Sequence, residues 1–157
     1  SVVGPAHLDP NVPSHGTAMM ETMLGGLQQA TGGSTSVQVL PIDVYGPGEV
    51  TSSFEVALGI ARAVEGGARI INLSLGSPGD NVVLHDVVRQ ASDMGVLLIG
   101  AAGNTPVTTP FYPAAYPAVH AVTAVAQQIG QRVQCGGICH AAVSLDSPRD
   151  DGGLAHQ

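Results

Sequence analysis

Two short apolar segments separated by one amphipathic stretch place the strongest constraint on the fold of this chain. Residues 69–75 (RIINLSL) and 96–101 (VLLIGA) are nearly continuous aliphatic runs, a pattern typical of strands buried on both faces of a sheet. Between them, Asn81 precedes a segment whose apolar residues recur at helical spacing, namely Leu84, Val87, Val88 and Ala91. A strand, a helix and a second strand in this order predict a parallel α/β sheet with right-handed crossovers.

The same alternation continues on both sides of this unit. Residues 37–44 alternate between apolar and polar side chains and predict a strand. Ser52 and Glu55 fit a capping box that begins a helix, and the pair Gly66-Gly67 ends it. Residues 119–125 predict the last strand. The expected fold class is therefore α/β, with a three-layer arrangement of a parallel sheet and helices on both of its faces.

The two ends of the chain differ in character from this central part. One more helix is predicted from His15 to about Gln29, because apolar residues recur there every three or four positions, at Met20, Met23, Leu24 and Leu27. Residues 1–14 predict a proline-containing loop with a short strand at its start. After about residue 126 the chain becomes rich in Gln, Gly and Asp and shows no clear period. We therefore expect one domain over residues 1–125 and an atypical C-terminal extension or tail over residues 126–157.

Composition excludes several classes of partner and cofactor. The net charge is −7 and the five basic residues are scattered, so we expect neither a nucleic acid nor an anionic membrane as a partner. No Gly-x-Gly-x-x-Gly follows a strand, which argues against a nucleotide-binding α/β domain. Cys135, Cys139 and His140 could be imagined as metal ligands, but no second ligand pair exists, and free thiols or a local disulfide are favoured. We expect no metal and no cofactor.

Residues that can carry chemistry follow the two buried strands. Parallel sheets place ligands at the carboxyl ends of their strands, where Ser74-Leu75-Gly76 and Ala101-Ala102-Gly103 are predicted to lie. The first group can pair with an extended peptide through main-chain hydrogen bonds, or it can form an ordinary turn. Asn104 follows the second group, where its amide can donate to a developing oxyanion. Alternatively, Asn104 only adopts a left-handed turn conformation, which asparagine tolerates.

His15 stands at the predicted start of the first helix. The positive end of a helix dipole disfavours the protonated ring, so a histidine there can serve as a general base. Gly16 allows other backbone to come close beside the ring. The simpler interpretation is that His15 is only a polar residue at a helix start.

In combination and in this order, these segments resemble the subtilisin-like serine proteases (subtilases, peptidase family S8). His15-Gly16-Thr17 resembles the histidine motif of that family, and residues 69–76 look like the strand that forms one wall of its S1 pocket. Residues 101–104 (AAGN) look like the opposite wall, which ends in the oxyanion-hole asparagine. Residues 112–125 (YPAAYPAVHAVTAV) are similar to a further stretch of the family. The resemblance covers residues 1–125 and identifies them as the central portion of a catalytic domain.

This resemblance implies a serine endopeptidase that cleaves peptide bonds through an acyl-enzyme. His15 would be the general base of the triad, and Asn104 the side-chain donor to the oxyanion. The primary specificity pocket would be lined by small or apolar residues that accept a large or apolar side chain: Ser74, Leu75, Gly76, Ala101, Ala102 and Gly103. The partner would be a polypeptide substrate or peptide ligand, and the family resemblance suggests a secreted or periplasmic protein.

The chain departs from the family at two positions of the triad. The Asp-x-Gly of the family lies some thirty residues before the histidine, whereas Asp9, in a proline-flanked loop, matches nothing in that motif. No Gly-Thr-Ser-Met-Ala-x-Pro string is present either. We therefore expect an incomplete sheet, and a chain that is inactive alone or needs a complementing segment or a homodimer. The alternative is a non-catalytic relative that binds peptides or regulates.

Overall fold

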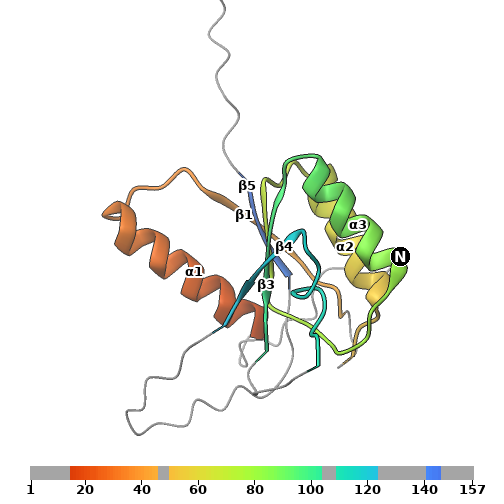
Figure 1. Ribbon diagram of the computed structural model, residues 1–157. Helices are drawn as coiled ribbons and strands as arrows, with labels where there is room; N and C mark the ends of the chain where they lie inside the picture. The colour runs from red at the N-terminus through yellow and green to blue at the C-terminus, as the bar shows by residue number, and fades with distance from the viewer. Residues whose placement is uncertain (1–14, 46–49, 104–108, 124–140, 146–157) are drawn as a thin grey trace, which may run out of the picture.

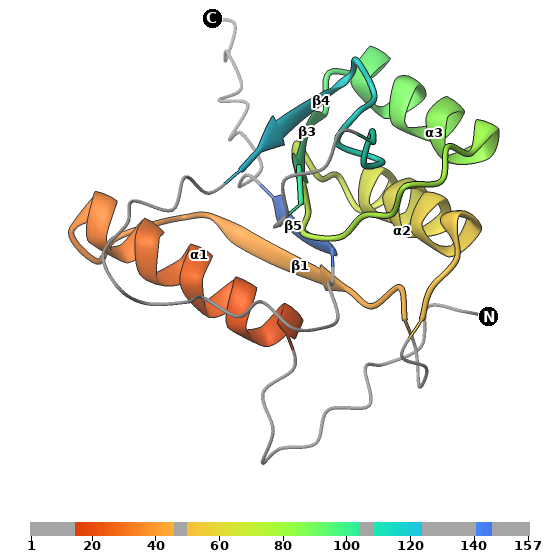
Figure 2. The ribbon, with the colours of Figure 1, turned by 60° about the horizontal axis from the view of Figure 1, so that its bottom comes forward.

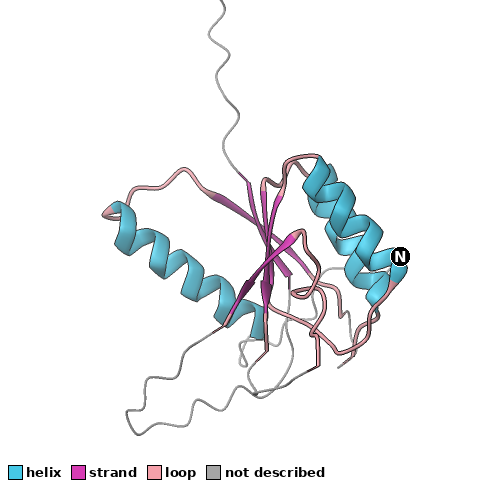
Figure 3. Ribbon diagram, viewed as in Figure 1, coloured by secondary structure: helices cyan, strands magenta, loops and turns pink. Residues whose placement is uncertain are grey.

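The sheet of this protein lies between two layers of helices, as a computed structural model describing residues 15–45, 50–103, 109–123 and 141–145 shows. Helix α1 covers one side of the sheet, and α2 and α3 lie together on the other (Figures 1, 2 and 3). The predicted three-layer α/β fold is thereby confirmed. The elements, in chain order, are α1 (His15–Thr31), β1 (Gln38–Ile42), α2 (Ser53–Glu65), β2 (Ile70–Leu73), α3 (Val82–Asp93), β3 (Leu97–Ala101), β4 (Val119–Val122) and β5 (Ala141–Leu145).

Two helices begin at the caps that the sequence indicates. At the start of α2, Ser52 Oγ accepts a hydrogen bond from the Glu55 backbone N–H at 3.2 Å, and the Glu55 carboxylate accepts one from the Ser52 N–H at 3.0 Å. At the start of α3, the Asn81 side chain accepts from the Leu84 N–H at 3.1 Å. Both caps satisfy backbone donors that a helix leaves without partners at its first turn.

Within the described residues, the sheet has five strands in the order β1-β5-β2-β3-β4. Strands β2, β3 and β4 pair in parallel, as the sequence predicts. Strand β5 pairs antiparallel with both β1 and β2, so β1 runs in the same direction as β2. The sequence predicted no element beyond residue 126, because five residues are too few to establish a period. The division of the chain at that residue stays a prediction.

Strands β2 and β3 are fully covered on one face only, whereas the sequence predicted burial on both. Ile71, Leu73 and Leu98 are completely buried under α2 and α3. On the opposite face, Ile70 and Leu97 remain 39% and 38% exposed. The reason is the position of α1, which packs against β5 rather than over β2 and β3 and has no fully buried residue.

None of the described helices is both long enough and apolar enough to pass through a membrane.

Candidate functional site

The structure brings together the two segments that the sequence placed at strand ends. Leu73 of β2 lies opposite Gly100 of β3 in the parallel register. Ser74-Leu75-Gly76 therefore leaves the sheet beside Ala101-Ala102-Gly103, at the same carboxyl edge. The second segment is held in place by a hydrogen bond from the Ala102 N–H to the Val122 carbonyl at 2.9 Å.

The strand extension after β2 is paired with the segment of residues 109–118. The Ser77 N–H donates to the Tyr112 carbonyl at 2.9 Å, and the Tyr112 N–H donates to the Ser77 carbonyl at 2.8 Å. Gly76 is required at this contact, because a Cβ there would lie 2.4 Å from Cε1 of Phe111. Gly103 is required for a different reason, since its φ of +99° is a conformation that other residues rarely adopt.

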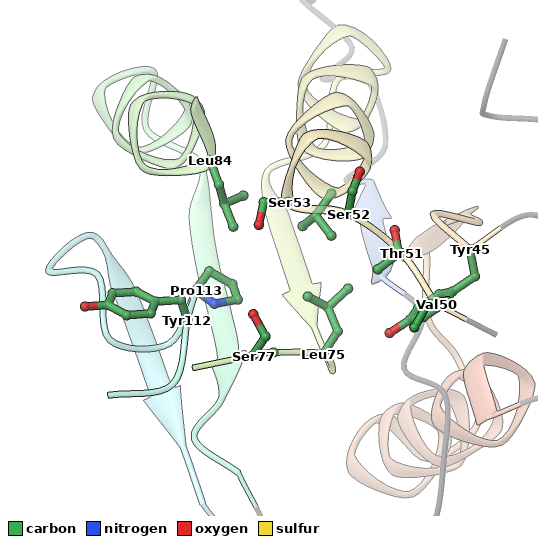
Figure 4. A pocket seen from close by; sticks show the side chains of 12 residues that line it. Tyr45, Val50, Thr51, Ser52, Ser53, Leu75, Ser77, Leu84, Tyr112 and Pro113 are labelled. Carbon is green, nitrogen blue, oxygen red and sulfur yellow. The ribbon is translucent and has the colours of Figure 1, made fainter. Parts of the chain in front are cut away.

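A pocket of about 230 Å³ opens beside Leu75. Figure 4 shows Leu75 and Ser77 below it, Leu84 from α3 on one side, and Pro113 close by. Its base includes Leu75, only 4% exposed, and its lining is drawn from five separate parts of the chain. The residues are Tyr45, Val50, Thr51, Ser52, Ser53, Val56, Leu75, Gly76, Ser77, Leu84, Tyr112 and Pro113.

Sequence reasoning found only two of these lining residues, Leu75 and Gly76. The remainder come from helix starts and loops whose approach to one another depends on the tertiary fold. Thr51 itself is held by residues near it in sequence, because its hydroxyl is in hydrogen-bond contact with the Val44 carbonyl and lies 3.1 Å from Oε2 of Glu55. The polar residues around the capping box at Ser52 are the sequence signal nearest to this pocket, and by themselves they indicate only a helix start.

A buried tyrosine links the 109–118 segment to α3. Tyr116 is 4% exposed, and its hydroxyl lies 2.9 Å from Oδ1 of Asp80 and 3.1 Å from the Asn81 carbonyl, both acceptors for its one proton. The same oxygen accepts from the Asn81 N–H at 3.2 Å. Burial raises the pKa of Tyr116 above its ordinary value; the Asn81 N–H opposes this rise and the Asp80 carboxylate adds to it.

His15 is half-buried and begins α1. In Figure 1, this end of α1 lies toward the edge of the sheet at which the chain leaves β3. Asn104, Asp9 and the cysteine pair Cys135 and Cys139 lie outside the described residues. Within the described ranges, no group of three or more His, Cys, Asp or Glu side chains is placed to hold a metal ion.

Comparison with known families decides what kind of protein has this arrangement. The model of the subtilase family, peptidase S8, matches residues 2–150. The chain belongs to the subtilase family. As a subtilase it is a member of a serine protease family, and the matched region includes the strand ends, the pocket and β5.

Known subtilases match parts of this chain. It is 45% identical over 91 residues to the thermostable alkaline protease of Halalkalibacterium halodurans, covering 58% of this chain and 24% of the relative. It is 40% identical over 87 residues to the minor extracellular protease Epr of Bacillus subtilis, covering 55% and 13%. The solved protease domain of PatA is 39% identical over 45% of this chain and 27% of that domain, with a TM-score of 0.43. The part of this subtilase that matches the Halalkalibacterium halodurans and Bacillus subtilis proteases thus spans a quarter or less of the length of either one.

Proposed function

We propose that this chain provides the general base and the substrate cleft of a subtilisin-like serine endopeptidase. The observation that carries the proposal is the adjacency of Ser74-Leu75-Gly76 and Ala101-Ala102-Gly103 at one carboxyl edge of the sheet. Membership of the subtilase family adds the reaction class. In this proposal His15 is the general base, Asn104 donates to the oxyanion, and the two strand-end segments line the primary specificity pocket.

The proposed reaction has two steps. His15 removes the proton from a serine hydroxyl as the oxygen attacks the scissile carbonyl, and it then passes this proton to the leaving amine. The side-chain amide of Asn104 donates to the oxyanion that forms on the carbonyl oxygen. Water then hydrolyses the resulting acyl-enzyme. The serine and the triad aspartate come from a complementing segment, because neither motif is recognisable in this chain.

The proposed substrate is an extended polypeptide. The backbone at Ser74-Leu75-Gly76 continues β2 beyond its last paired residue, so it can pair with an added strand. The pocket beside Leu75 is lined by Val56, Leu84 and Pro113 as well as by hydroxyl side chains. It therefore accepts an apolar side chain of that polypeptide, next to the proposed primary specificity pocket, with which it shares Leu75 and Gly76.

The remaining elements of the proposal follow from resemblance and from the exposed sheet face. We assign the catalytic portion to residues 1–125 and the extension to residues 126–157. Ile70 and Leu97 are partly exposed on the face of β2 and β3 that points away from α2 and α3. This exposed apolar surface favours a complementing chain or a homodimer that covers it. By resemblance to relatives such as the extracellular protease Epr, we propose secretion or a periplasmic location.

A second candidate function is a non-catalytic relative that binds peptides. The observation that favours it is the presence of the cleft and pocket in a chain without recognisable serine and aspartate motifs. Such a protein would bind polypeptides without cleaving them.

Labelling with a fluorophosphonate tests the endopeptidase proposal. The purified chain is incubated with the probe, and intact mass is measured for the wild type and for His15→Ala. The proposal predicts no adduct in the chain alone and a stoichiometric, His15-dependent adduct once the complementing segment is supplied. A folded chain that binds peptides and never labels in any complemented assembly would favour the non-catalytic function.

A further inference from the structure

Asn72 is the only polar residue of strand β2, whose sequence is Ile-Ile-Asn-Leu. It lies inside the sheet, where its partners in register are Ile99 of β3 and Ala142 of β5. Asparagine is depleted in strands, and a half-buried amide loses hydration unless it forms a hydrogen bond. The pairing of β2 with its neighbours does not require an amide side chain here, so the group that this side chain contacts indicates its role.

The amide of Asn72 donates to the hydroxyl of Ser74. Its Nδ2 lies 2.7 Å from Ser74 Oγ, because residues two positions apart project from the same face of an extended chain. A serine hydroxyl has one proton to donate and two lone pairs that accept. Asn72 therefore occupies a lone pair of the oxygen, and the proton of Ser74 stays available for another acceptor.

These two side chains lie on the face of the sheet opposite α2 and α3. Ile71 and Leu73, which alternate with them along the strand, are completely buried, and Leu75 continues this alternation toward its own pocket. The Ser74 hydroxyl is therefore separate from that pocket and lies on the side of the sheet that carries α1 (Figure 1). Ser74 is only half-buried, so a ligand at the strand end can reach its proton.

A polypeptide bound along Ser74-Leu75-Gly76 brings acceptors of one kind to this position. Each of its residues carries a main-chain carbonyl oxygen, whatever its side chain. We propose that Asn72 is a positioning residue that keeps the Ser74 hydroxyl as a hydrogen-bond donor for a main-chain carbonyl oxygen of the bound polypeptide. This inference rests on the proposed function, because it requires that a polypeptide binds at the strand end. The contact adds affinity without selecting a side chain.

Asn72→Asp tests the proposal, because it replaces the Nδ2 donor by an acceptor in a side chain of the same shape. The Ser74 proton then turns to the carboxylate and is no longer available to the polypeptide. The probe is a blocked hexapeptide of alanine that carries leucine at the position giving the highest affinity, and NMR titration measures its binding. We expect Asn72→Asp and Ser74→Ala each to weaken binding about fivefold, which corresponds to one net hydrogen bond.

The double variant separates positioning from a structural role. Because Asn72 acts through the Ser74 hydroxyl, Asn72→Asp combined with Ser74→Ala should bind the peptide as tightly as Ser74→Ala alone. A structural role of Asn72 would lower the affinity further in the double variant. Gln90→Glu makes the same change from amide to carboxylate at an exposed position of α3. It is the matched control and should bind the peptide like the wild type.

Asn72→Val is a second variant at the same position, and it tests the proposal even where Asn72→Asp does not fold. Valine favours strands and offers neither a donor nor an acceptor. The Ser74 proton then stays free but loses its fixed orientation. We expect a loss of affinity of about twofold, and only while Ser74 is present. Thermal unfolding shows whether each variant is folded.

Peptides with a thiocarbonyl group in place of one carbonyl at a time identify the acceptor. Sulfur accepts a hydrogen bond more weakly than oxygen does. One position should therefore weaken binding to the wild type about fivefold, and the same peptide should show clearly less loss on Ser74→Ala.

The outcomes distinguish this inference from the proposed function. Wild-type affinity in Asn72→Asp would overturn the inference, since the Ser74 hydroxyl would then already donate to Asn72. A further loss in the double variant would overturn it as well, and so would the lack of any thiocarbonyl position that depends on Ser74. A wild type that binds none of the peptides would instead overturn the proposed function, and the role of Asn72 with it.

Discussion

Ser77 and Tyr112 pair their backbones through two hydrogen bonds of 2.9 and 2.8 Å, although 35 positions separate them in the sequence. This bridge fixes the strand extension after β2 against the segment that precedes β4. This strand extension, Ser74-Leu75-Gly76, is the part of the chain that we propose to bind polypeptide. Its geometry therefore depends on residues that come after β3, outside the continuous strand-helix-strand unit.

Gly76→Ala is expected to destabilise the protein by about 1–3 kcal/mol, as overpacking does. The added Cβ would lie 2.4 Å from Phe111 and 2.9 Å from the Tyr112 carbonyl oxygen, so the bridge must shift. Gly25→Ala serves as the matched control, because nothing lies within 4 Å of its Cβ position in α1 and alanine favours helix. Thermal unfolding measures both, and equal stability of the two variants would contradict the close contact at Gly76.

Leu98→Ala and Leu97→Ala compare the two faces of one strand. Leu98 is completely buried, and we expect its truncation to cost about 2–5 kcal/mol. Leu97 is 38% exposed on the opposite face, so its truncation should cost clearly less, because it loses less buried area. Denaturant unfolding of the isolated chain measures the difference. A reversed order would mean that the Leu97 face is covered in solution, by a second copy or another chain.

Val143→Pro tests the central position of β5. Val143 pairs with Leu40 of β1 and with Ile71 of β2, so a proline removes a hydrogen-bond donor in the middle of the sheet. We expect a clear loss of stability, because the proline removes a ladder hydrogen bond, measured by thermal unfolding, whereas Val143→Ala keeps the N–H and serves as the control. Equal stability of the two variants would contradict an interior position for this strand.

Alkaline pH should weaken the contribution of Tyr116 to stability. Its folded-state pKa is raised above the ordinary value of 10.0, so the neutral hydroxyl stabilises the fold below pH ~10 and loses this effect as the pH rises through the folded-state pKa. The difference in unfolding free energy between the wild type and Tyr116→Phe should therefore shrink between about pH 8 and about pH 11. A constant difference would show that the hydroxyl titrates alike in the folded and unfolded chain.

The sequence was sufficient for the features that depend on neighbouring residues. Ser52 with Glu55, and Asn81, predicted the starts of α2 and α3, because a cap is formed by residues three positions apart. The parallel strands followed from their apolar runs. The strand-end groups came together as expected, since consecutive parallel strands end at one edge.

Features that depend on distant residues were not predictable in this way. The pocket brings Val56, Leu84 and Pro113 together, and nothing near any one of them indicates the others. The interior strand β5 has no sequence period of its own and depends on its partners β1 and β2. Burial on both faces was the wrong expectation for β2 and β3, because an apolar run reveals the character of a strand without revealing where a helix such as α1 will pack.

The place of β5 in the sheet sets an order on the formation of the fold. Of the strands in the described residues, the last, β5, lies between the first two, pairing Leu145 with Gln38 and Val143 with Ile71. While a ribosome is still synthesising residues 126–157, β1 and β2 have no strand between them, and each exposes an unpaired edge. Contacts of such long sequence separation form slowly, so the nascent chain passes through an interval in which its sheet is open at the centre.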